Sequence, residues 1–449
     1  MILLQGPKTP GPIQMLQWIF DPLGYTEAAS QRYGDIFLGK VGWDYSPHVF
    51  VSNPKAIEQI FTSESKQFYP LTESFKKFSK PILGEHSISV LEGVNHRRQR
   101  QLLMPYFHGE QIKKYGIKIC YITEKIMSRL DHDKPFLVHE LMKNISLEAI
   151  LEVVFGLGKG ERYQLLKKLL LSWLNYLVSP VHASLLFFSF LQKDLGSWSP
   201  WGRFIRLKKQ LDEVLYSEIQ ERRKQVDSEH NDILTLLLSS RDEKGEGMTD
   251  EELHDTLLTL LIAGYETTSG SLAWALYWIH HMPNVYNKLL KELDSLGNSP
   301  DVLSLSQLPY LTAISQETLR IYPIAPLNLP HVVIKPAKLM DYELKPGTKV
   351  VIDIYQTHHR EDLYPNPKQF RPERFLEKQF SSYEYLPFGG GSRRCIGAAL
   401  SLFEMKLVLA TILLRYQLKL LDKKPVQPRR QISFIVPAGG VKMAVLGQH

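Results

Sequence analysis

Cysteine is nearly absent from the chain: only Cys120 and Cys395 occur among its 449 residues. Two cysteines exclude a disulfide framework and any metal site with four thiolate ligands. Sparse cysteine is typical of proteins that stay in a reducing cytosol. We therefore expect a cytoplasmic protein without structural disulfides.

Long apolar runs are missing as well. No uninterrupted run reaches the roughly 18 residues that a membrane-spanning helix needs. The most apolar stretch, Ala183 to Leu191, is short and contains two serines. The N-terminus has neither the charged region nor the apolar core of a secretory signal and reaches Pro7 almost at once. The sequence predicts a soluble chain without a transmembrane anchor and leaves open whether 183–191 touches a membrane surface.

No repeat, low-complexity segment or clear linker interrupts the sequence. Hydrophobic residues make up 44% and charged residues 22% of the chain, as in ordinary globular proteins. The 54 basic and 47 acidic residues leave a net charge of +7, which favours acidic partners without indicating nucleic acid. We expect a single domain over residues 1–449.

Hydrophobic periodicity divides the chain into helical and β-rich portions. Helical spacing dominates residues 96–330 and 396–416, whereas the β-rich portion covers 30–65 and 330–360. A long helix begins with a capping box, in which Thr249 is the N-cap and Glu252 lies three residues on, and runs to about Met282. Short strands are expected at 36–41, 49–51, 332–334, 340–344 and 349–354. The pattern predicts a mainly α fold with a smaller β-rich lobe.

The segment Phe-Gly-Gly-Gly-Ser-Arg-Arg-Cys-Ile-Gly at 388–397 places Cys395 between a compact glycine loop and the start of a helix. The positive end of a helix dipole lowers the pKa of a thiol, and loop N–H groups stabilise the thiolate that binds a soft metal. Gly391 and Gly397 let a flat cofactor approach the backbone. An inert buried cysteine is the alternative. Phosphate binding is disfavoured, because neither a Walker lysine nor a GxGxxG pattern is present.

The spacing Phe388-x-x-Gly391-x-Arg393-x-Cys395-x-Gly397 resembles the haem-binding signature of the cytochrome P-450 family, the haem-thiolate monooxygenases. The resemblance covers nearly the whole chain and is nearest to a cyanobacterial branch. It implies the cytochrome P-450 fold and haem b as cofactor. It also implies that Cys395 is the proximal ligand of the haem iron and that Arg393 pairs with a haem propionate.

Two further motifs follow the order of the family. Glu317 and Arg320 lie one helical turn apart, and Phe-Arg-Pro-Glu-Arg-Phe follows at 370–375. Alone, the first two residues would be an ordinary surface pair. The resemblance implies that Glu317, Arg320 and Arg374 form a buried ion cluster behind the cysteine loop, which supports the fold rather than the chemistry.

The segment Ala263-Gly264-Tyr265-Glu266-Thr267 lies in the middle of the long helix. Gly264 weakens a helix by about 1 kcal/mol relative to alanine and suits a local opening of its hydrogen bonds. A hydroxyl that only bonds back to its own helix is the plain alternative. The segment resembles the oxygen-activating motif of the family, which implies a groove for O₂, with Thr267 as the alcohol and Glu266 on the proton-delivery path.

His96 and Arg100 share one face of a basic helix start and resemble the propionate-binding position of the family. A solvated basic face is the alternative, and nucleic acid is disfavoured because no aromatic stacking platform accompanies the charges. His331 follows Pro330 where many relatives carry arginine. The resemblance implies a propionate contact from His331, either as imidazolium or through a neutral N–H, and hence one that depends on pH.

The implied reaction inserts one oxygen atom from O₂ into a hydrophobic terpenoid, long-chain fatty acid or alkane. Electrons come from an external ferredoxin and its reductase, because the length leaves no room for a flavin or nicotinamide domain. Basic residues near the cysteine loop and at 96–100 would dock this acidic donor. The residues expected to line the substrate pocket, for each of which core packing is the alternative, are Phe75, Phe78, Ile82, Leu83, Ile88, Val90, Trp173, Leu177, Leu257, Leu261, Ala263, Ile324, Ala325, Leu327, Phe434 and Ile435.

Three other functions are compatible with parts of the pattern. A peroxygenase of the same fold would use H₂O₂ directly, but such relatives typically replace the acid–alcohol pair that Glu266 and Thr267 retain. A haem-binding sensor or sequestering protein would need no proton-relay residues. The third is a protein without haem in which Cys395 is inert.

Overall fold

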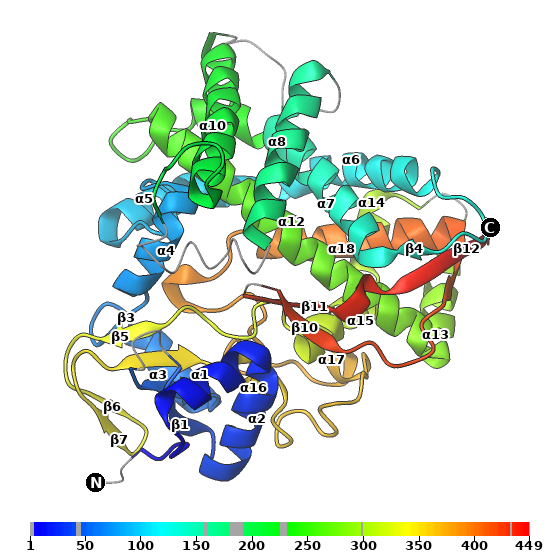
Figure 1. Cartoon of the computed structure of the whole chain (residues 1–449). Coiled ribbons are helices and arrows are strands. Elements are labelled where there is room, and N and C mark those ends of the chain that lie inside the picture. Colours follow the sequence, from blue (N-terminus) through cyan, green and yellow to red (C-terminus); the bar gives the residue numbers. More distant parts are fainter. Residues whose placement is uncertain are drawn as a thin grey trace.

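The computed structural model describes residues 4–41, 46–156, 160–178, 192–224, 231–297, 300–431 and 433–448. Helices form its centre and its upper part in Figure 1, and a smaller β-rich lobe with the N-terminal helices lies below them. The mainly α fold with a smaller β-rich lobe is thereby confirmed. The apolar stretch 183–191 lies outside the described residues. In the part of the chain that the structure describes, we find no helix with the length and apolar character needed to cross a membrane.

The β-rich lobe is organised around a five-stranded sheet in the order β1-β2-β8-β5-β3. Strands β2 and β8 are parallel, and the other neighbours are antiparallel. The expected hairpin of the first two strands is confirmed. The elements of the lobe are α1 (Gly11–Phe20), α2 (Pro22–Tyr33), β1 (Ile36–Gly39), β2 (His48–Val51), α3 (Pro54–Thr62), β3 (Phe68–Tyr69), β5 (His331–Val333), β6 (Ala337–Leu339), β7 (Tyr342–Leu344) and β8 (Lys349–Ile352).

Helix α3 leads from the sheet to the cysteine loop. Its start is fixed locally, because the side chain of Asn53 accepts hydrogen bonds from the amides of Lys55 and Ala56 while Pro54 occupies the first turn. Its apolar face packs on the sheet through Ile57 and Ile60, both fully buried. The C-terminal end of α3 reaches the segment that precedes Cys395, where the helix contacts the short 3₁₀ turn η3 (Gly391–Arg393).

One expected strand begins two residues too early, because β7 covers only Tyr342–Leu344. The sequence pattern placed a strand at 340–344, but Met340 has a φ of +52° and belongs to the turn between β6 and β7, which pair as a hairpin. A positive φ is uncommon for a residue other than glycine, and a methionine at this position gives no sequence signal for a turn. Apolar and polar residues alternate from Met340 through the turn into β7. The pattern therefore does not reveal the turn, and β6 is missed.

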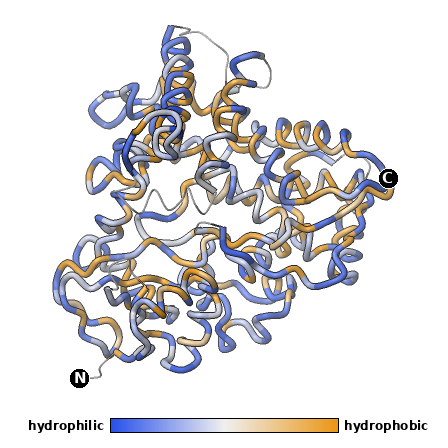
Figure 2. The backbone as a smooth tube through the Cα atoms, in the orientation of Figure 1, coloured by the Kyte–Doolittle hydropathy of each residue, from blue (hydrophilic) through white to orange (hydrophobic). Residues whose placement is uncertain are grey.

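Most of the remaining chain is helical and surrounds one large apolar core. Figure 2 shows hydrophobic stretches along the central helices and hydrophilic ones on many loops at the edge. The helices are α4 (Glu73–Leu83), α5 (Gly93–Leu103), α6 (Glu110–Met127), α7 (Val138–Phe155), α8 (Glu161–Val178), α10 (Pro200–Lys224), α11 (Ile233–Ser239), α12 (Asp250–His281), α13 (Pro283–Asp294), α14 (Val302–Gln307), α15 (Pro309–Ile321), α16 (Ile354–His358), α17 (Arg374–Glu377) and α18 (Ala398–Arg415).

Helix α12 runs through the middle of this core. Its capping box is confirmed: Thr249 accepts from the amide of Glu252, and the carboxylate of Glu252 accepts from the amide of Thr249. The helix packs against α7, α18, α15 and α10 (Figure 1). A Cβ on Gly264 would lie 2.9 Å from the Ile150 side chain on α7. The glycine therefore leaves room for the Ile150 side chain where the two helices pack together.

The C-terminal part adds strands that the sequence pattern did not assign to the β-rich portion. Strand β12 (Lys442–Gln448) lies between β4 (Phe136–Leu137) and β9 (Tyr416–Leu420). The hairpin of β10 (Pro428–Gln431) and β11 (Phe434–Pro437) contacts α12, where the carbonyl of Ile435 accepts a hydrogen bond from Trp274 Nε1 at 3.2 Å. The amide of Ile435 donates to the carbonyl of Ile324. The end of the chain thus returns to the central helix.

Candidate functional site

The cysteine loop is a tight turn that requires glycine. Gly389 and Gly391 have φ values of +66° and +63°, and the amide of Cys395 donates to the carbonyl of Phe388 at 3.0 Å. A Cβ on Gly390 would collide with the ring of Phe61 at the end of α3. The loop is therefore compact because its own backbone and a neighbouring helix leave no space for side chains.

Cys395 is exposed although it follows a loop enclosed between two parts of the molecule. Ala263, in the middle of the otherwise buried α12, is exposed as well. The hydroxyls of Thr268 on α12 and Ser401 on α18 lie 3.4 Å apart, so these two interior helices are neighbours just after the cysteine loop. The sulfur of Cys395 is thus accessible to solvent, yet it is surrounded by enough protein that burial raises the pKa of the thiol.

The state of the thiol differs from the sequence expectation. Burial raises the pKa of Cys395, while a hydrogen bond from the Gly397 amide and the charges of Arg100 and Arg394 act in the opposite direction. The expected lowering of this pKa is therefore wrong for the chain alone, because the cost of enclosing an anion outweighs the helix start and the arginines. A metal ion would deprotonate the thiol on ligation, and the same donors would then stabilise the thiolate.

The basic residues expected near the cofactor do lie beside the loop. Arg393 donates to the carbonyls of Ile88 at 2.8 Å and Leu91 at 2.5 Å, in the segment before α5. Arg100 on α5 donates to the carbonyl of Arg394 at 2.7 Å.

His96 lies on the same helix and is buried. Burial, with the charges of Arg393 and Arg100, lowers the pKa of His96 to about 4. The imidazole is therefore neutral at physiological pH.

His331 on β5 is buried and contacts an acid that the sequence analysis missed. Its Nε2 lies 3.0 Å from Oε1 of Glu64, just after α3. The other carboxylate oxygen of Glu64 accepts the amide of Ser392 in the cysteine loop at 2.8 Å. Glu64 is distant in sequence from both partners and belongs to no motif, so no short-range signal could have identified it.

These residues meet the requirements of a cofactor that carries carboxylates. Among the residues described, His331 Nδ1 and Arg393 Nε are buried side-chain atoms that find no hydrogen-bond partner. A buried donor left unpaired costs about 1–3 kcal/mol. The propionates of haem are acceptors of the kind these atoms lack, and Cys395 offers the soft ligand for its iron. The residues present therefore fit haem.

The ion cluster behind the loop is fully enclosed. Arg320 on α15 donates to both carboxylate oxygens of Glu317, at 2.7 and 2.9 Å, and Arg374 on α17 reaches Glu317 at 3.1 Å. Arg320 also donates to the carbonyl of His358, whose Nε2 accepts the amide of Leu386 at the start of the cysteine loop. The cluster thus connects α15 to the loop through α16.

The acid and the alcohol on α12 face different neighbours. Thr267 donates its hydroxyl to the carbonyl of Ala263 at 2.6 Å, which is the back-bonded arrangement. The helix is continuous through this turn, so the expected opening of its hydrogen bonds is not seen.

Glu266 is buried, and Lys143 lies 3.8 Å from it. Its other carboxylate oxygen accepts a 3.3 Å hydrogen bond from Gln431. Burial raises the pKa of Glu266, with Lys143 opposing and Glu140 adding to the rise.

Apart from the exposed Ala263, the expected pocket residues with described side chains divide into two groups. Seven that are only partly buried are Phe75, Phe78, Leu83, Ile88, Ala325, Leu327 and Phe434. Seven that are buried in the core are Ile82, Val90, Trp173, Leu257, Leu261, Ile324 and Ile435. Trp173 stacks on Phe204 with ring centroids 5.9 Å apart, so it packs between α8 and α10. The side chain of Leu177 lies outside the described part of the chain.

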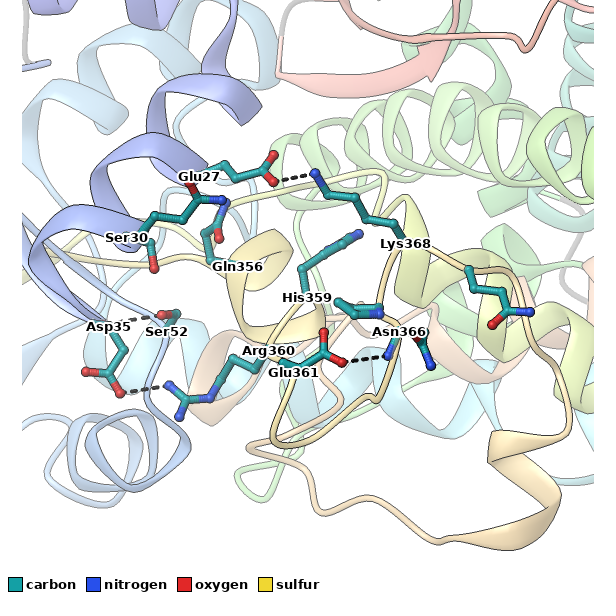
Figure 3. A pocket seen from close by; sticks show the side chains of 13 residues that line it. Glu27, Ser30, Asp35, Ser52, Gln356, His359, Arg360, Glu361, Asn366 and Lys368 are labelled. Atoms are coloured by element: carbon teal, nitrogen blue, oxygen red, sulfur yellow. Dashed lines mark hydrogen bonds and ion pairs between the residues drawn. The ribbon is translucent and has the colours of Figure 1, made fainter.

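A separate hollow opens between α2 and the segment after α16 (Figure 3). Its volume is about 660 Å³, and its lining is polar. The charged side chains satisfy one another: Lys368 pairs with Glu27, and Arg360 donates to Asp35 at 2.7 Å. The cysteine loop contributes nothing to its lining, so it is distinct from the site of Cys395.

Comparison with known proteins identifies the family of the chain. The cytochrome P-450 family model matches residues 7–445. Cytochrome P-450 135B1 of Mycobacterium tuberculosis is 32% identical, covering 99% of this chain and 92% of its own length. Cytochrome P-450 138 of the same organism is 31% identical over 87% of this chain and 84% of its own.

Among solved structures, the cyanobacterial CYP120A1 with bound retinoic acid has the same fold. Its TM-score is 0.83 with 22% identity, and the match covers 96% of each chain. The family model and the mycobacterial relatives extend over nearly the whole sequence, in agreement with the cysteine loop and the ion cluster. The chain therefore belongs to the cytochrome P-450 family and is an oxidoreductase of the monooxygenase type.

Proposed function

We propose that this enzyme binds haem b through Cys395 and oxidises a terpenoid or a long-chain fatty acid. The observation that carries this proposal is the accessible sulfur of Cys395, together with buried nitrogens of Arg393 and His331 that have no hydrogen-bond partner in the described part of the chain. A thiolate-ligated haem supplies reductive cleavage of O₂ and transfer of one oxygen atom. The chain supplies the positions and protons around it.

The proton for this chemistry has a route from the surface to α12. Glu140 on α7 is exposed and lies 3.3 Å from Lys143, and Lys143 lies 3.8 Å from the buried Glu266. Burial raises the pKa of Glu266, so its carboxyl group holds a proton more readily than an exposed glutamate would. We assign proton delivery to Glu266 and the alcohol role to Thr267, which occupies the next position of the helix.

The partly buried apolar residues support the proposed substrate class. Phe78, Leu83, Ile88 and Phe434 are in contact with the large core yet remain partly open. Apolar walls favour a substrate with few charges. CYP120A1, which shares the fold, holds retinoic acid, an isoprenoid carboxylic acid, and this supports a terpenoid or a fatty acid.

Spectral titration tests this substrate class. A ligand that displaces water from the iron changes its spin state and shifts the Soret band of the ferric protein. We expect terpenoid acids and long-chain fatty acids to shift it at micromolar concentrations, on the order of −8 kcal/mol of binding free energy. Short polar acids of equal charge are the control. Equal responses to both panels would contradict the proposed class.

An acidic electron donor such as a ferredoxin is the second part of the proposal. Arg97 on α5 and Arg394 in the cysteine loop are exposed, and α5 lies beside this loop, because Arg100 donates to the carbonyl of Arg394. Arg98 has another role, because it pairs with Asp242 and with Glu252 at the start of α12. Exposed arginines near the loop favour association with an acidic surface.

Charge reversal tests this docking surface. We expect Arg97→Glu combined with Arg394→Glu to slow reduction by ferredoxin about tenfold or more at low salt, since steering contributes at least that much to association. Lys338→Glu, on the distant β6–β7 hairpin, is the matched control and should leave the rate unchanged. A rate that is independent of salt and of both arginines would contradict docking at this surface.

A further inference from the structure

Glu64 lies where the β-rich lobe meets the cysteine loop. Its Oε1 is 3.0 Å from Nε2 of His331, and its Oε2 accepts the Ser392 amide at 2.8 Å. The carboxylate is 8% exposed, and the imidazole is 1% exposed. A Cβ on Gly391 would collide with this carboxylate. The acid is thus enclosed between a strand and the loop that carries Cys395.

The contact determines which nitrogen of His331 carries a proton. Burial alone would raise the pKa of Glu64, but hydrogen bonds from His331 and Ser392 outweigh it and lower the pKa below its usual value. An ionised carboxylate only accepts hydrogen bonds, so Nε2 of His331 is a donor. The ring of Phe61 packs edge-on against the imidazole with centroids 5.9 Å apart and limits its rotation.

The second nitrogen, Nδ1, is buried and has no hydrogen-bond partner within the described ranges. In a neutral ring with a proton on Nε2, Nδ1 presents a lone pair. A lone pair and a carboxylate are both acceptors and cannot pair. A haem propionate therefore pairs with Nδ1 only when the ring is an imidazolium with a proton on each nitrogen.

We propose that Glu64 is a positioning residue of the haem site, which holds His331 as an imidazolium that offers its Nδ1–H to a haem propionate. The inference rests on the proposed haem site and adds the residue that sets one of its donors. It also accounts for histidine at a position where arginine is usual. An arginine carries its charge without help, whereas a histidine needs a counter-charge on its far side.

Haem loss measures this role without reference to activity. Each ferric holoprotein is mixed with excess apomyoglobin, and the rate of haem transfer is followed. We expect Glu64→Gln to accelerate haem loss about tenfold, in the range of residues that orient a cofactor ligand. Glu64→Asp, which keeps the charge, should restore most of the native rate. Glu92→Gln is the matched control, because Glu92 also faces Arg393 but pairs with Lys76 instead of His331.

Glu64→Gln is also made in a His331→Arg background. This double variant shows whether Glu64 acts on the His331 ring or only supports the cysteine loop through Ser392. If Glu64 acts through the charge of His331, Glu64→Gln should have less than about a twofold effect once a permanent cation replaces the ring. Equal acceleration in both backgrounds, or an equal effect of Glu92→Gln, would overturn the inference. A Glu64→Gln chain that folds only in the His331→Arg background supports it, and one that folds in neither overturns it.

The reduced, CO-bound spectrum of the native protein separates failure of the proposed Glu64 role from failure of the proposed haem site. A thiolate–haem spectrum together with equal acceleration in both backgrounds overturns the role of Glu64 alone. Lack of that spectrum in the native protein overturns the proposed haem site and, with it, this inference.

Discussion

In the proposed haem site the sulfur of Cys395 is the ligand of the iron, and its surroundings suit a metal-bound thiolate better than a free one. Burial raises the pKa of the thiol, and the Gly397 amide with the charges of Arg100 and Arg394 opposes that rise. A bound iron would remove the proton, and the same N–H group and cations would then stabilise the anion. These surroundings support the proposed role of Cys395 as a metal ligand rather than a role as a free nucleophile.

Thr267 is the residue whose role in coupling can be tested most sharply. We expect Thr267→Ala to retain haem and substrate but to convert electrons into peroxide, with product per electron pair falling about tenfold or more, as when a proton-transfer group is lost. Product, peroxide and consumed electron donor are measured together. Coupling should fall because the variant lacks the Thr267 hydroxyl, which is hydrogen-bonded to the carbonyl of Ala263 in the structure.

Ser271 supplies a matched control on the same helix. Its hydroxyl donates to the carbonyl of Thr267 at 2.9 Å, so it makes the same kind of bond one turn further on. Ser271→Ala should leave coupling unchanged. If Thr267→Ala couples as well as the native enzyme, the hydroxyl has only a structural role.

The sequence could identify which residues belong to the site but not all of their contacts. Cys395 and Arg393 were identified from spacing within ten positions, because a compact loop needs its glycines and its cysteine close together. The partners of Arg393 in the structure are the carbonyls of Ile88 and Leu91, and Glu64 contacts Ser392. Such pairs lie hundreds of residues apart and depend on how whole elements pack, which periodicity does not record.

At the scale of elements, α15, α16 and α17 are joined to the cysteine loop by buried charges. Glu317 and Arg320 are fully buried, and Arg374 is nearly so. We expect Glu317→Gln to lower the free energy of unfolding by about 3–5 kcal/mol, because it leaves two buried guanidinium groups without their counter-charge. Urea unfolding of the holoprotein, followed by circular dichroism and by haem release, measures the loss.

An exposed pair between neighbouring elements is the control for this prediction. Lys288 on α13 pairs with Glu373 at 2.6 Å, and more than half of the Lys288 side chain is exposed. Lys288→Ala should cost no more than about 1 kcal/mol. Similar losses from the two variants would show that the buried cluster contributes no more than a surface pair.

His254 connects α12 to α10 and to the segment before α5. Its two nitrogens lie 2.9 Å from Asp212 on α10 and 2.9 Å from Asp255, and Asp255 also accepts the amide of His86 at 2.8 Å. The ring of Tyr216 stacks on the imidazole with centroids 4.5 Å apart. Burial lowers the pKa of His254, but the two carboxylates outweigh it and raise the pKa above its ordinary value.

This connection makes stability depend on pH in a defined direction. A group whose pKa is raised by folding stabilises the native state fully below its unfolded pKa, and this contribution is lost as pH rises through the folded value. We expect His254→Gln to cost about 2 kcal/mol near pH 6, as for hydrogen bonds to charged groups. The cost should shrink as the pH rises through the raised pKa of His254.

His280 on the same helix serves as the control. Burial lowers the pKa of His280 to about 4, and its ring is hydrogen-bonded to the carbonyl of Leu276. The ring is neutral throughout this pH range, so the cost of His280→Gln should not vary with pH. Denaturant titrations of both variants at several pH values provide the measurement. A constant cost for His254→Gln would contradict a charged bridge.

Helix α12 also shows where element-level prediction from sequence reaches its limit. Its start, its length and its buried middle follow from the capping box and the apolar pattern. The packing role of Gly264 could not be predicted in this way, because it depends on the Ile150 side chain of another helix. A packing constraint of this kind is visible only once both helices are in place.

For the whole molecule, composition and periodicity predicted a large helical region and a smaller β-rich lobe, as observed (Figure 1). Strand partners were not predictable in the same way. Strand β2 pairs with β8, and β3 pairs with β5, across most of the chain. The cysteine loop lies where the two regions meet, contacted by α3 from one and by α5 and α18 from the other. Its position is thus a property of the complete fold.

The central claim is that Cys395 is the thiolate ligand of a haem iron, and the difference spectrum of the dithionite-reduced, CO-bound protein tests it most directly. We expect the strongly red-shifted Soret band of a thiolate–haem–CO complex from the native protein, and its loss in Cys395→Ala. A haem band without that shift in the native protein, or an unchanged spectrum in the variant, would contradict the assignment.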